Sequence, residues 1–324
     1  MPQKSYAYAN GRLAVIGQRM LGSAFLSRLV ESEAQEAVKL LRDANYGAGA
    51  QDPNDVEQLI AAEIAASRAL VWELTPEPEV IKLFLLKTDA HNLKTLLKAK
   101  LLGIEAGELM TEGGAYSVAQ LQKAVNEGDV STLPGQFQKA IEEAEAIAEK
   151  SGDPGLISAA VDRAVFDYIG AALKRGGNAF AKRYFSAQAD FANVQSLIRA
   201  RALGWGEERL TPMLVSGGGI AKEAILACLE VPMEHLAARL STGQFGGDIA
   251  KALEEYARTG SLRALERSMD RRLMEMVRAE KSDIFGMGPI LGYLLGREAE
   301  ARAIRVIFAA KFAKAAPELP ELYV

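Results

Sequence analysis

The sequence predicts an all-α fold, and three observations support this prediction. Ala, Leu, Glu, Lys and Arg dominate the 324 residues and only 7% are aromatic, which is typical of a chain rich in helix formers. Apolar residues recur at steps of three and four over long stretches, as they do along one face of a helix. No segment alternates strictly over four or more residues, and β-branched residues are sparse, so strands are not expected.

The first part of the chain predicts long helices separated by short breaks. About the first 45 residues have helical periodicity throughout, and a cluster of Gly, Asn, Pro and Asp at 45–55 interrupts it. A second helix is expected from Leu59 to Trp72, before a turn at 75–79. A third begins at Val80 and ends at Gly103, because glycine commonly terminates helices.

The rest of the chain repeats this alternation. Connectors rich in Gly, Ser, Pro and Asp are expected at 111–114, 126–135, 151–155 and 216–219. Apolar periodicity predicts helices among them, including 137–150, 156–173 and 266–279.

One pattern occurs at both 89–103 and 190–204. Each copy has an Asp, an Asn three residues later, apolar residues at positions +4, +7 and +8, bases at +9 and +11, and a closing Leu-Gly. A weaker third copy at 300–314 begins with Glu, has Ala303 in place of the Asn, and keeps a base at +11. We call these three segments the signature helices. Self-similarity of this kind indicates an internal repeat of about 100 residues.

The repeat predicts three similar helical lobes, at 1–104, 105–205 and 206–324. Its period is far longer than the roughly 33–47 residues of common helical solenoids, so we expect a closed or funnel arrangement. An acid recurs more loosely in the helix before each signature: Glu63, Asp162 and Glu266. A chain built from three copies of one unit is better suited to holding a partner than to catalysing a reaction.

The sequence offers no compact catalytic or metal-binding pattern. His91 and His235 have no further His or Cys within four residues, and the single Cys228 is expected to be a small buried residue. The segment SGGGIAK at 216–222 lacks the spacing of a phosphate-binding loop and no strand precedes it. We therefore predict no catalytic, cofactor-binding or metal-ligating residue.

Charge and hydropathy exclude other classes of function. A formal net charge of −4 gives no reason to expect binding to nucleic acid or to an anionic membrane surface. No stretch approaches the roughly 18 apolar residues of a membrane-spanning helix, and the N-terminus lacks a signal-peptide core. A soluble cytosolic protein is expected, and a single cysteine fits a reducing compartment.

The bases of the signature helices have two interpretations. At about 100° per residue, the base at +11 lies along the apolar side of its helix: Lys100, Arg201 and Lys311. A base on a core-facing side needs an anionic partner, which favours ion pairs within each lobe, with Glu63, Asp162 and Glu266 as candidates. The alternative is a ring of bases presented to a partner, which fits better with Lys98 and Arg199 on the polar side.

Several motifs in this order resemble the C subunit of bacterial and archaeal V/A-type ATPases, a family whose eukaryotic members are called the d subunit. They are SYAYANGRLAVIGQRML at 5–21, LLRDANYG at 40–47, the Asp-x-x-Asn signatures at 89–92 and 190–193, and an ending that runs from ALERSMD at 264–270 to GPILGYLLGREAEARAIRVIFAAK at 288–311. The chain departs from the family at Gly11, where Ala is more common, and at Ala303, where Asn is expected.

The resemblance implies a funnel of three pseudo-threefold-related lobes without catalytic residues. One side would receive the rotor shaft, with Lys98 and Arg199 as candidate contacts, and the other would rest on the membrane-embedded proteolipid ring. The protein would transmit torque during ATP-coupled ion transport, as a cytoplasmic part of the complex that is peripheral to the membrane. Three alternatives stay open: proton or sodium transport, a helical scaffold in another complex, and a helical enzyme with a site assembled from distant residues.

Overall fold

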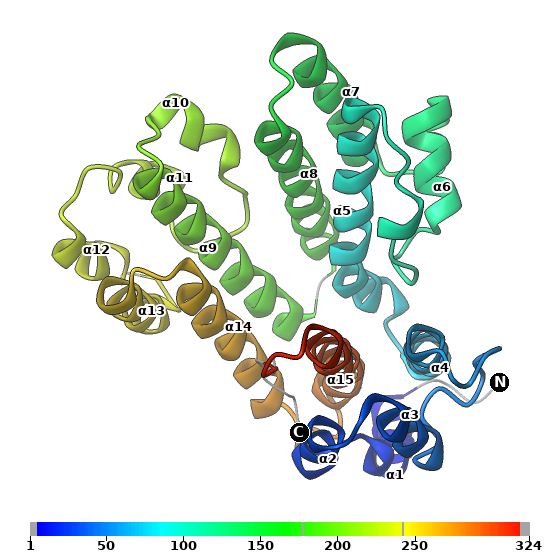
Figure 1. Cartoon of the computed structure of the whole chain (residues 1–324). Coiled ribbons are helices and arrows are strands. Elements are labelled where there is room, and N and C mark those ends of the chain that lie inside the picture. The colour runs from blue at the N-terminus through cyan, green and yellow to red at the C-terminus, as the bar shows by residue number, and fades with distance from the viewer. Residues whose placement is uncertain (1–4, 177, 242, 318–324) are drawn as a thin grey trace. The chain divides into compact units, whose positions relative to one another are not determined.

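The computed structural model describes residues 5–176, 178–241 and 243–317, and every regular element within these ranges is helical (Figure 1). The ends of the first and third predicted lobes, 1–4 and 318–324, lie outside the described residues. The predicted all-α class is confirmed by helices α1 (Tyr6–Ile16), α2 (Ser23–Glu31), α3 (Ala34–Asp43), α4 (Val56–Leu74), α5 (Pro78–Leu102), α6 (Val118–Gln122), α7 (Gly135–Lys150), α8 (Pro154–Lys174), α9 (Ala179–Ala202), α10 (Glu207–Leu210), α11 (Lys222–Leu226), α12 (Met233–Leu240), α13 (Gly246–Thr259), α14 (Leu262–Ala279) and α15 (Gly288–Ala313).

Capping residues explain where several helices begin. Asp55 accepts the N–H groups of the first turn of α4, and Asp153 does the same for α8, where Pro154 follows it. The first 45 residues form three helices instead of the continuous one expected. Met20 and Ser32 adopt extended backbone conformations that end the helical segments, so apolar periodicity alone did not reveal the breaks.

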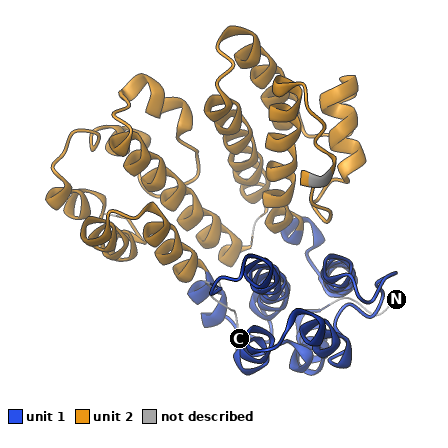
Figure 2. Cartoon of the chain, in the orientation of Figure 1, with its two compact units in different colours: residues 1–81, 274–324 blue, residues 82–273 orange. Residues whose placement is uncertain are grey.

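The chain forms two compact units, residues 1–81 with 274–324 and residues 82–273 (Figure 2). In the first unit, α15 contacts α1, α2 and α4. Most residues of α15 are buried, including the charged Arg297, Glu298 and Glu300. Its core residues pack with side chains from the N-terminal helices, including Leu26, Leu29, Leu41, Ile60, Ile304 and Ile307.

In the second unit, α7 packs against α8, α12 against α13, and α9 contacts α8, α10 and α11. Aromatic side chains join α5 to α9, because the ring of Phe84 lies 5.1 Å from that of Tyr184 and 4.7 Å from that of Phe185.

Among the described residues, no helix is both long enough and apolar enough to cross a membrane.

Candidate functional site

The signature helices form the C-terminal parts of α5, α9 and α15, and all three helices end alike. A residue in the left-handed conformation follows each of them: Gly103 (φ 65°), Gly204 (φ 65°) and Lys314 (φ 51°). The next N–H group then donates to a carbonyl five residues earlier: Ile104 to Ala99 (3.0 Å), Trp205 to Ala200 (2.8 Å) and Ala315 to Ala310 (2.9 Å). This is the hydrogen bond of a Schellman motif, and it accounts for the Leu-Gly closure of the first two copies.

The first position of each signature is a fully buried carboxylate that holds a distant loop. Asp89, Asp190 and Glu300 are at most 1% exposed. Their oxygens accept backbone N–H groups: Asp89 from Ala115 (2.7 Å) and Tyr116 (3.1 Å), Asp190 from Gly219 (3.0 Å) and Ile220 (2.9 Å), and Glu300 from Leu21. Burial raises the pKa of Asp190, and its two backbone hydrogen bonds oppose that shift.

The Asn at the fourth position adds a second pair of bonds in two copies. Asn92 donates to the carbonyl of Thr111 (2.8 Å) and accepts its N–H (2.9 Å). Asn193 makes the same pair with Val215, at 3.1 Å and 2.8 Å. In the third copy, Ala303 is fully buried in the core of its unit, so apolar packing takes the place of this contact.

The base at +11 binds backbone carbonyls in all three copies. These carbonyls lie within or just beyond short helical segments: Lys100 donates to Val125 (2.7 Å), Arg201 to Cys228 (2.7 Å) and Leu229 (2.8 Å), and Lys311 to Val30 (2.9 Å) and Ser32. Cations are favourable there because helix C-termini carry unpaired carbonyls and partial negative charge. Lys100 additionally pairs with Glu145 at 2.7 Å.

The three acids suggested as partners of these bases pair with other cations. Glu63 pairs with Arg297 (3.3 Å), Asp162 with Lys94, and Glu266 with Arg199 (3.5 Å). Ion pairs therefore form, but between different residues from those suggested. The partners of the bases at +11 are mostly carbonyls, which any residue type can supply, so no sequence signal marks them.

Two glycines of the connectors are needed where a signature carboxylate approaches the backbone. A Cβ atom at Gly114 would lie 2.0 Å from Oδ1 of Asp89, and one at Gly218 would lie 2.2 Å from Oδ1 of Asp190. A side chain at either position would displace the carboxylate from its N–H donors. The glycine-rich connectors thus accommodate acids of the protein itself, and Lys222 of SGGGIAK donates to the carbonyl of Leu214 (3.1 Å).

The third copy takes its contacts from the N-terminal part of the chain. Asp89 and Asp190 hold donors 26–30 residues after them. Glu300 and Lys311 instead hold Leu21 and Val30, which precede them by about 280 residues (|i−j| of 279 and 281). The C-terminal signature helix and the N-terminal helices therefore make one set of contacts within the first unit.

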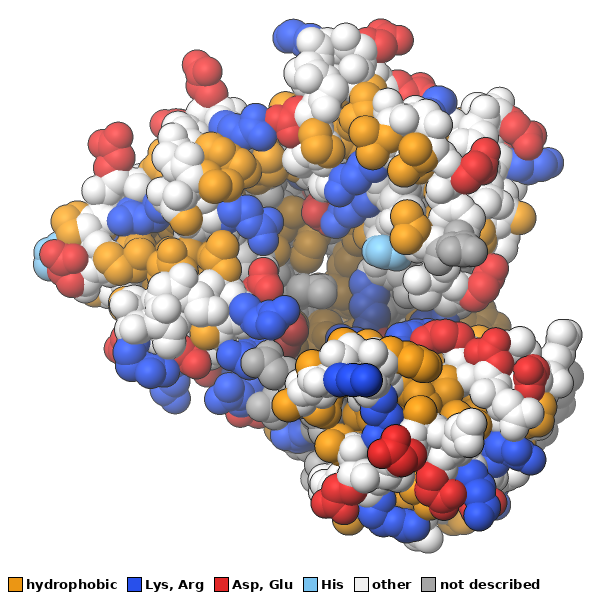
Figure 3. All heavy atoms as spheres, viewed as in Figure 1, with side chains coloured by type: hydrophobic (Ala, Val, Ile, Leu, Met, Phe, Trp, Pro, Cys, Tyr) orange, Lys and Arg blue, Asp and Glu red, His pale blue; other side chains and the backbone are white. Residues whose placement is uncertain are grey.

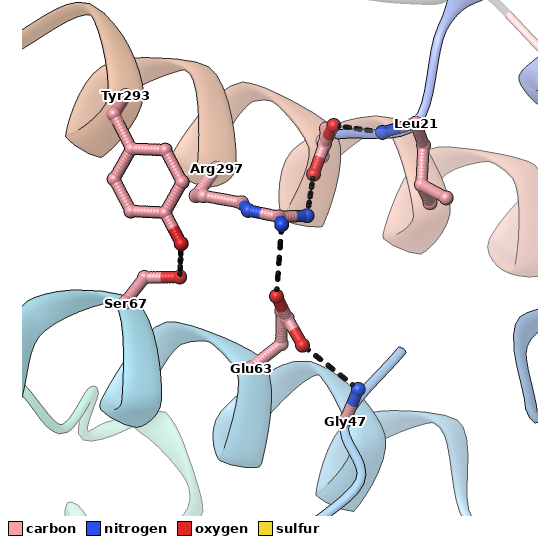
Figure 4. A network of polar contacts seen from close by, with 7 residues as sticks. Leu21, Gly47, Glu63, Ser67, Tyr293 and Arg297 are labelled. Atoms are coloured by element: carbon pink, nitrogen blue, oxygen red, sulfur yellow. Dashed lines mark hydrogen bonds and ion pairs between the residues drawn. The ribbon is translucent and has the colours of Figure 1, made fainter. Parts of the chain in front are cut away.

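A buried ionic network centred on Arg297 adds further contacts between α15 and α4. Arg297 is 3% exposed and lies between two carboxylates, 2.8 Å from Glu300 and 3.3 Å from Glu63. Glu63 also accepts the N–H of Gly47 (2.9 Å). Figure 4 shows the Arg297 guanidinium pointing toward Glu63 of α4, with Leu21 held on the other side of the network.

Burial raises the pKa of Glu300 to about 7, although Arg297 and the N–H of Leu21 favour its ionised form. The folded protein thus binds the proton of the Glu300 carboxyl group more tightly than the unfolded chain does. The stability that this proton adds is fully present below the ordinary carboxyl pKa and is lost as the pH rises through about 7.

We expect the free energy of unfolding of the first unit to fall between about pH 5 and about pH 7, by on the order of 2 kcal/mol. Urea unfolding across this range measures it, and Glu300→Gln should flatten the slope because the titrating group is gone. Glu57→Gln, which alters an exposed pair with Arg305, should leave the slope unchanged. Equal slopes in wild type and Glu300→Gln would contradict the assignment.

Both candidate contacts for the shaft, Lys98 and Arg199, lie in the second unit. Arg199 and its partner Glu266 are about half exposed, with side chains 51% and 45% accessible, and Lys98 is half-buried. On the face that Figure 3 shows, Lys and Arg side chains lie among Asp and Glu side chains. A role in binding for these two bases remains a prediction.

Within the described residues, no group of three or more His, Cys, Asp and Glu side chains could hold a metal ion. Cys228 is buried, and burial raises the pKa of its thiol. His91 lies 3.2 Å from the carbonyl of Leu109, a local contact.

Comparisons with known proteins agree over nearly the whole chain. The family described as "ATP synthase (C/AC39) subunit" matches residues 9–321. The C subunit of the A-type ATP synthase of Methanothermobacter thermautotrophicus is 28% identical, with 97% of this chain and 86% of that protein covered. The C subunit of the V-type ATP synthase of Thermus thermophilus is 24% identical, with 93% of both chains covered. The C subunit of the V-type sodium ATPase of Enterococcus hirae is 24% identical, with 76% of this chain and 75% of that protein covered.

The family match includes all three signature helices up to residue 314 and the N-terminal segment that the third one holds. It therefore covers the contacts described above, and the resemblance suggested by the motifs is confirmed. The chain belongs to the ATP synthase (C/AC39) subunit family, the non-catalytic C subunits of V/A-type rotary ATPases.

Proposed function

We propose that this chain is the central-stalk subunit that joins the rotor shaft of a V/A-type ATPase to its membrane-embedded proteolipid ring. The observation that carries the proposal is the family match over residues 9–321. The protein performs no chemistry and transmits torque between ATP turnover and ion transport, from a peripheral position on the cytoplasmic side. Relatives are named both as ATP synthases and as a sodium ATPase, so either proton or sodium transport fits.

The proposal includes three lobes, at 1–104, 105–205 and 206–324, related by a pseudo-threefold axis in a funnel. It is supported by the recurrence of one buried acid, one carbonyl-binding base and one helix ending in each signature helix. The contacts of the third signature with the N-terminal residues suit a closed arrangement. Close-packed helices also suit torque transmission, because protein interiors are poorly compressible.

Affinity purification from native membranes tests this function. The tagged chain should bring down both shaft and proteolipid subunits in a mild detergent. Recovery of a different, reproducible set of partners would favour the alternative, a helical scaffold of another complex. Recovery of neither shaft nor ring from membranes that contain an intact ATPase would contradict the proposal.

The proposed function also predicts how the shaft docks. If Lys98 and Arg199 face the shaft, the Lys98→Glu/Arg199→Glu variant should bind it more slowly at low salt, by about tenfold, because exposed charges steer association more than they add affinity. The difference should shrink as salt rises, since mobile ions screen exposed charges. Stopped-flow or surface-based association rates measure this.

The matched control reverses two exposed bases of α7, Lys139→Glu and Lys150→Glu, and changes the net charge equally. It should bind the shaft at close to the wild-type rate. Equal slowing of both double variants would show that total charge, and not a local contact, sets the rate.

A further inference from the structure

The acids that precede the signature helices form ion pairs that follow one rule. Each acid pairs with the long helix that ends the preceding proposed lobe, and the lobe before the first is the last: Asp162 with Lys94, Glu266 with Arg199 (3.5 Å) and Glu63 with Arg297 (3.3 Å). Each pair lies within one compact unit. The pairs therefore connect the lobes in a cyclic order, first to second, second to third and third to first.

The acid and the base of each signature helix follow the same order. Those of α5 bind residues between 115 and 125, and those of α9 bind residues between 219 and 229, in the next lobe each time. Those of α15 bind Leu21 and Val30 of the first lobe. The peptide chain runs directly through the first two junctions, whereas Leu21 and Glu300 are 279 residues apart in sequence. The third junction is held by noncovalent contacts alone, because a single cysteine cannot form an internal disulfide.

The third junction has the least exposed of these ion pairs. The side chains of Arg297 and Glu63, which meet in Figure 4, are 4% and 15% exposed, and Glu300 adds a third buried charge. A second pair between the same two helices, Arg68 with Glu298 at 3.3 Å, is 15% and 10% exposed. At the other two junctions the paired side chains are 27–51% exposed. Separating buried charges costs far more than separating exposed ones, which favours all-or-none opening of the third junction.

Apolar packing joins the same elements. The core of the first unit combines side chains from both ends of the chain, such as Leu26, Leu29 and Ile60 with Ile304 and Ile307. The helix α15 contacts α1, α2 and α4, and α2 contacts α3. Removing α15 would therefore expose the apolar side chains of the N-terminal helices as well as its own. We define the latch as helices α1–α4 together with α15.

We infer that the latch opens and closes as one cooperative body while the second unit stays folded. Proteins open in contiguous cooperative parts of this kind, at a lower free energy than complete unfolding requires. Opening separates the C-terminal helix from the N-terminal helices and leaves the other two junctions intact, because both lie within the second unit. The latch is a property of the chain itself and needs no partner, so it goes beyond the proposed function.

Hydrogen exchange of the full chain, followed by mass spectrometry of its peptides, tests the latch. In the wild type, peptides of α2, α4 and α15 should exchange through one common opening. Arg297→Met should speed this exchange by about a hundredfold or more in all three helices, because two carboxylates lose their buried cation. Peptides of α7 and α8, in the second unit, should exchange as they do in the wild type.

A milder variant covers the case in which Arg297→Met leaves the latch fully open. Lys311→Met removes the hydrogen bonds to the carbonyls of Val30 and Ser32, and it should speed exchange of the same three helices by about tenfold. Lys94→Met is the matched control, since it removes a cation from the first junction. It should leave exchange of the latch unchanged.

The pattern of exchange decides the outcome. Complete loss of protection in α2, α4 and α15 of Arg297→Met, with α7 and α8 still protected, would support the latch. Equal acceleration in α7 and α8 would overturn it, because the chain would then unfold as one body. Acceleration confined to α15, which is fraying of one helix, would overturn it as well, and so would unchanged exchange in both latch variants. Each of these results leaves the proposed function standing.

Discussion

Replacing Arg297 with methionine is expected to destabilise the first unit by about 3–5 kcal/mol. The guanidinium is 3% exposed and bonds to Glu300 and Glu63, which lie on α15 and α4. Its loss leaves the fully buried Glu300 and the mostly buried Glu63 without their shared cation. Glu63 on α4 and Glu300 on α15 are then both unpaired. The loss of unfolding free energy is therefore that of unpaired buried charge and not of a single hydrogen bond.

Urea unfolding at about pH 8, above the pKa of about 7 of Glu300 in the wild-type protein, measures the effect. Arg305→Met is the matched control on the same helix, because Arg305 pairs with Glu57 at 3.0 Å while both side chains are largely exposed (44% and 62%). That change should cost less than about 1 kcal/mol. Converting Glu63 and Glu300 to Gln as well should recover much of the stability lost in Arg297→Met. A similar loss of unfolding free energy in Arg297→Met and Arg305→Met would contradict the importance of the buried network.

The second large effect is expected at a glycine. Gly218→Ala should destabilise the second unit by about 2–4 kcal/mol, because the new Cβ atom would lie 2.2 Å from Oδ1 of Asp190. The carboxylate must move, and the N–H groups of Gly219 and Ile220 then lose their acceptor inside the protein. Gly114→Ala should act in the same way through Asp89.

A double-mutant cycle separates this mechanism from a general loss of glycine. Asp190→Ala removes the carboxylate, so adding Gly218→Ala to it should cost little, and the two changes should be far from additive. Gly135→Ala, at a position where a Cβ atom meets nothing within 4 Å, should be neutral or slightly stabilising. Additive costs of Asp190→Ala and Gly218→Ala would show that the two residues do not act together.

Local rules predict the helices well and their ends less well. Apolar periodicity and capping residues such as Asp153 mark where helices lie. They did not reveal the two breaks within the first 45 residues, because Met20 and Ser32 end helices through backbone conformation and not through a residue type that breaks them.

Long-range contacts were predicted only in part. The repeat correctly drew attention to Asp89, Asp190 and Glu300, but their acceptor roles depend on N–H groups that any residue carries. The sequence identified 111–114 and 216–219 only as connectors, because the need for Gly114 and Gly218 appears only once the carboxylates are in place. Arg297 lies outside the repeated pattern, and its position between two acids on different helices left no signal in spacing.

The measurement that tests the central claim most directly is a bridging assay with purified parts. Immobilised proteolipid rings are incubated with labelled shaft subunits, with and without this chain. If the chain joins the two, the shaft should be retained on the ring only when the chain is present, with one chain bound for each ring. Equal retention of the shaft without the chain, or a chain that binds ring and shaft only in separate complexes, would contradict the account.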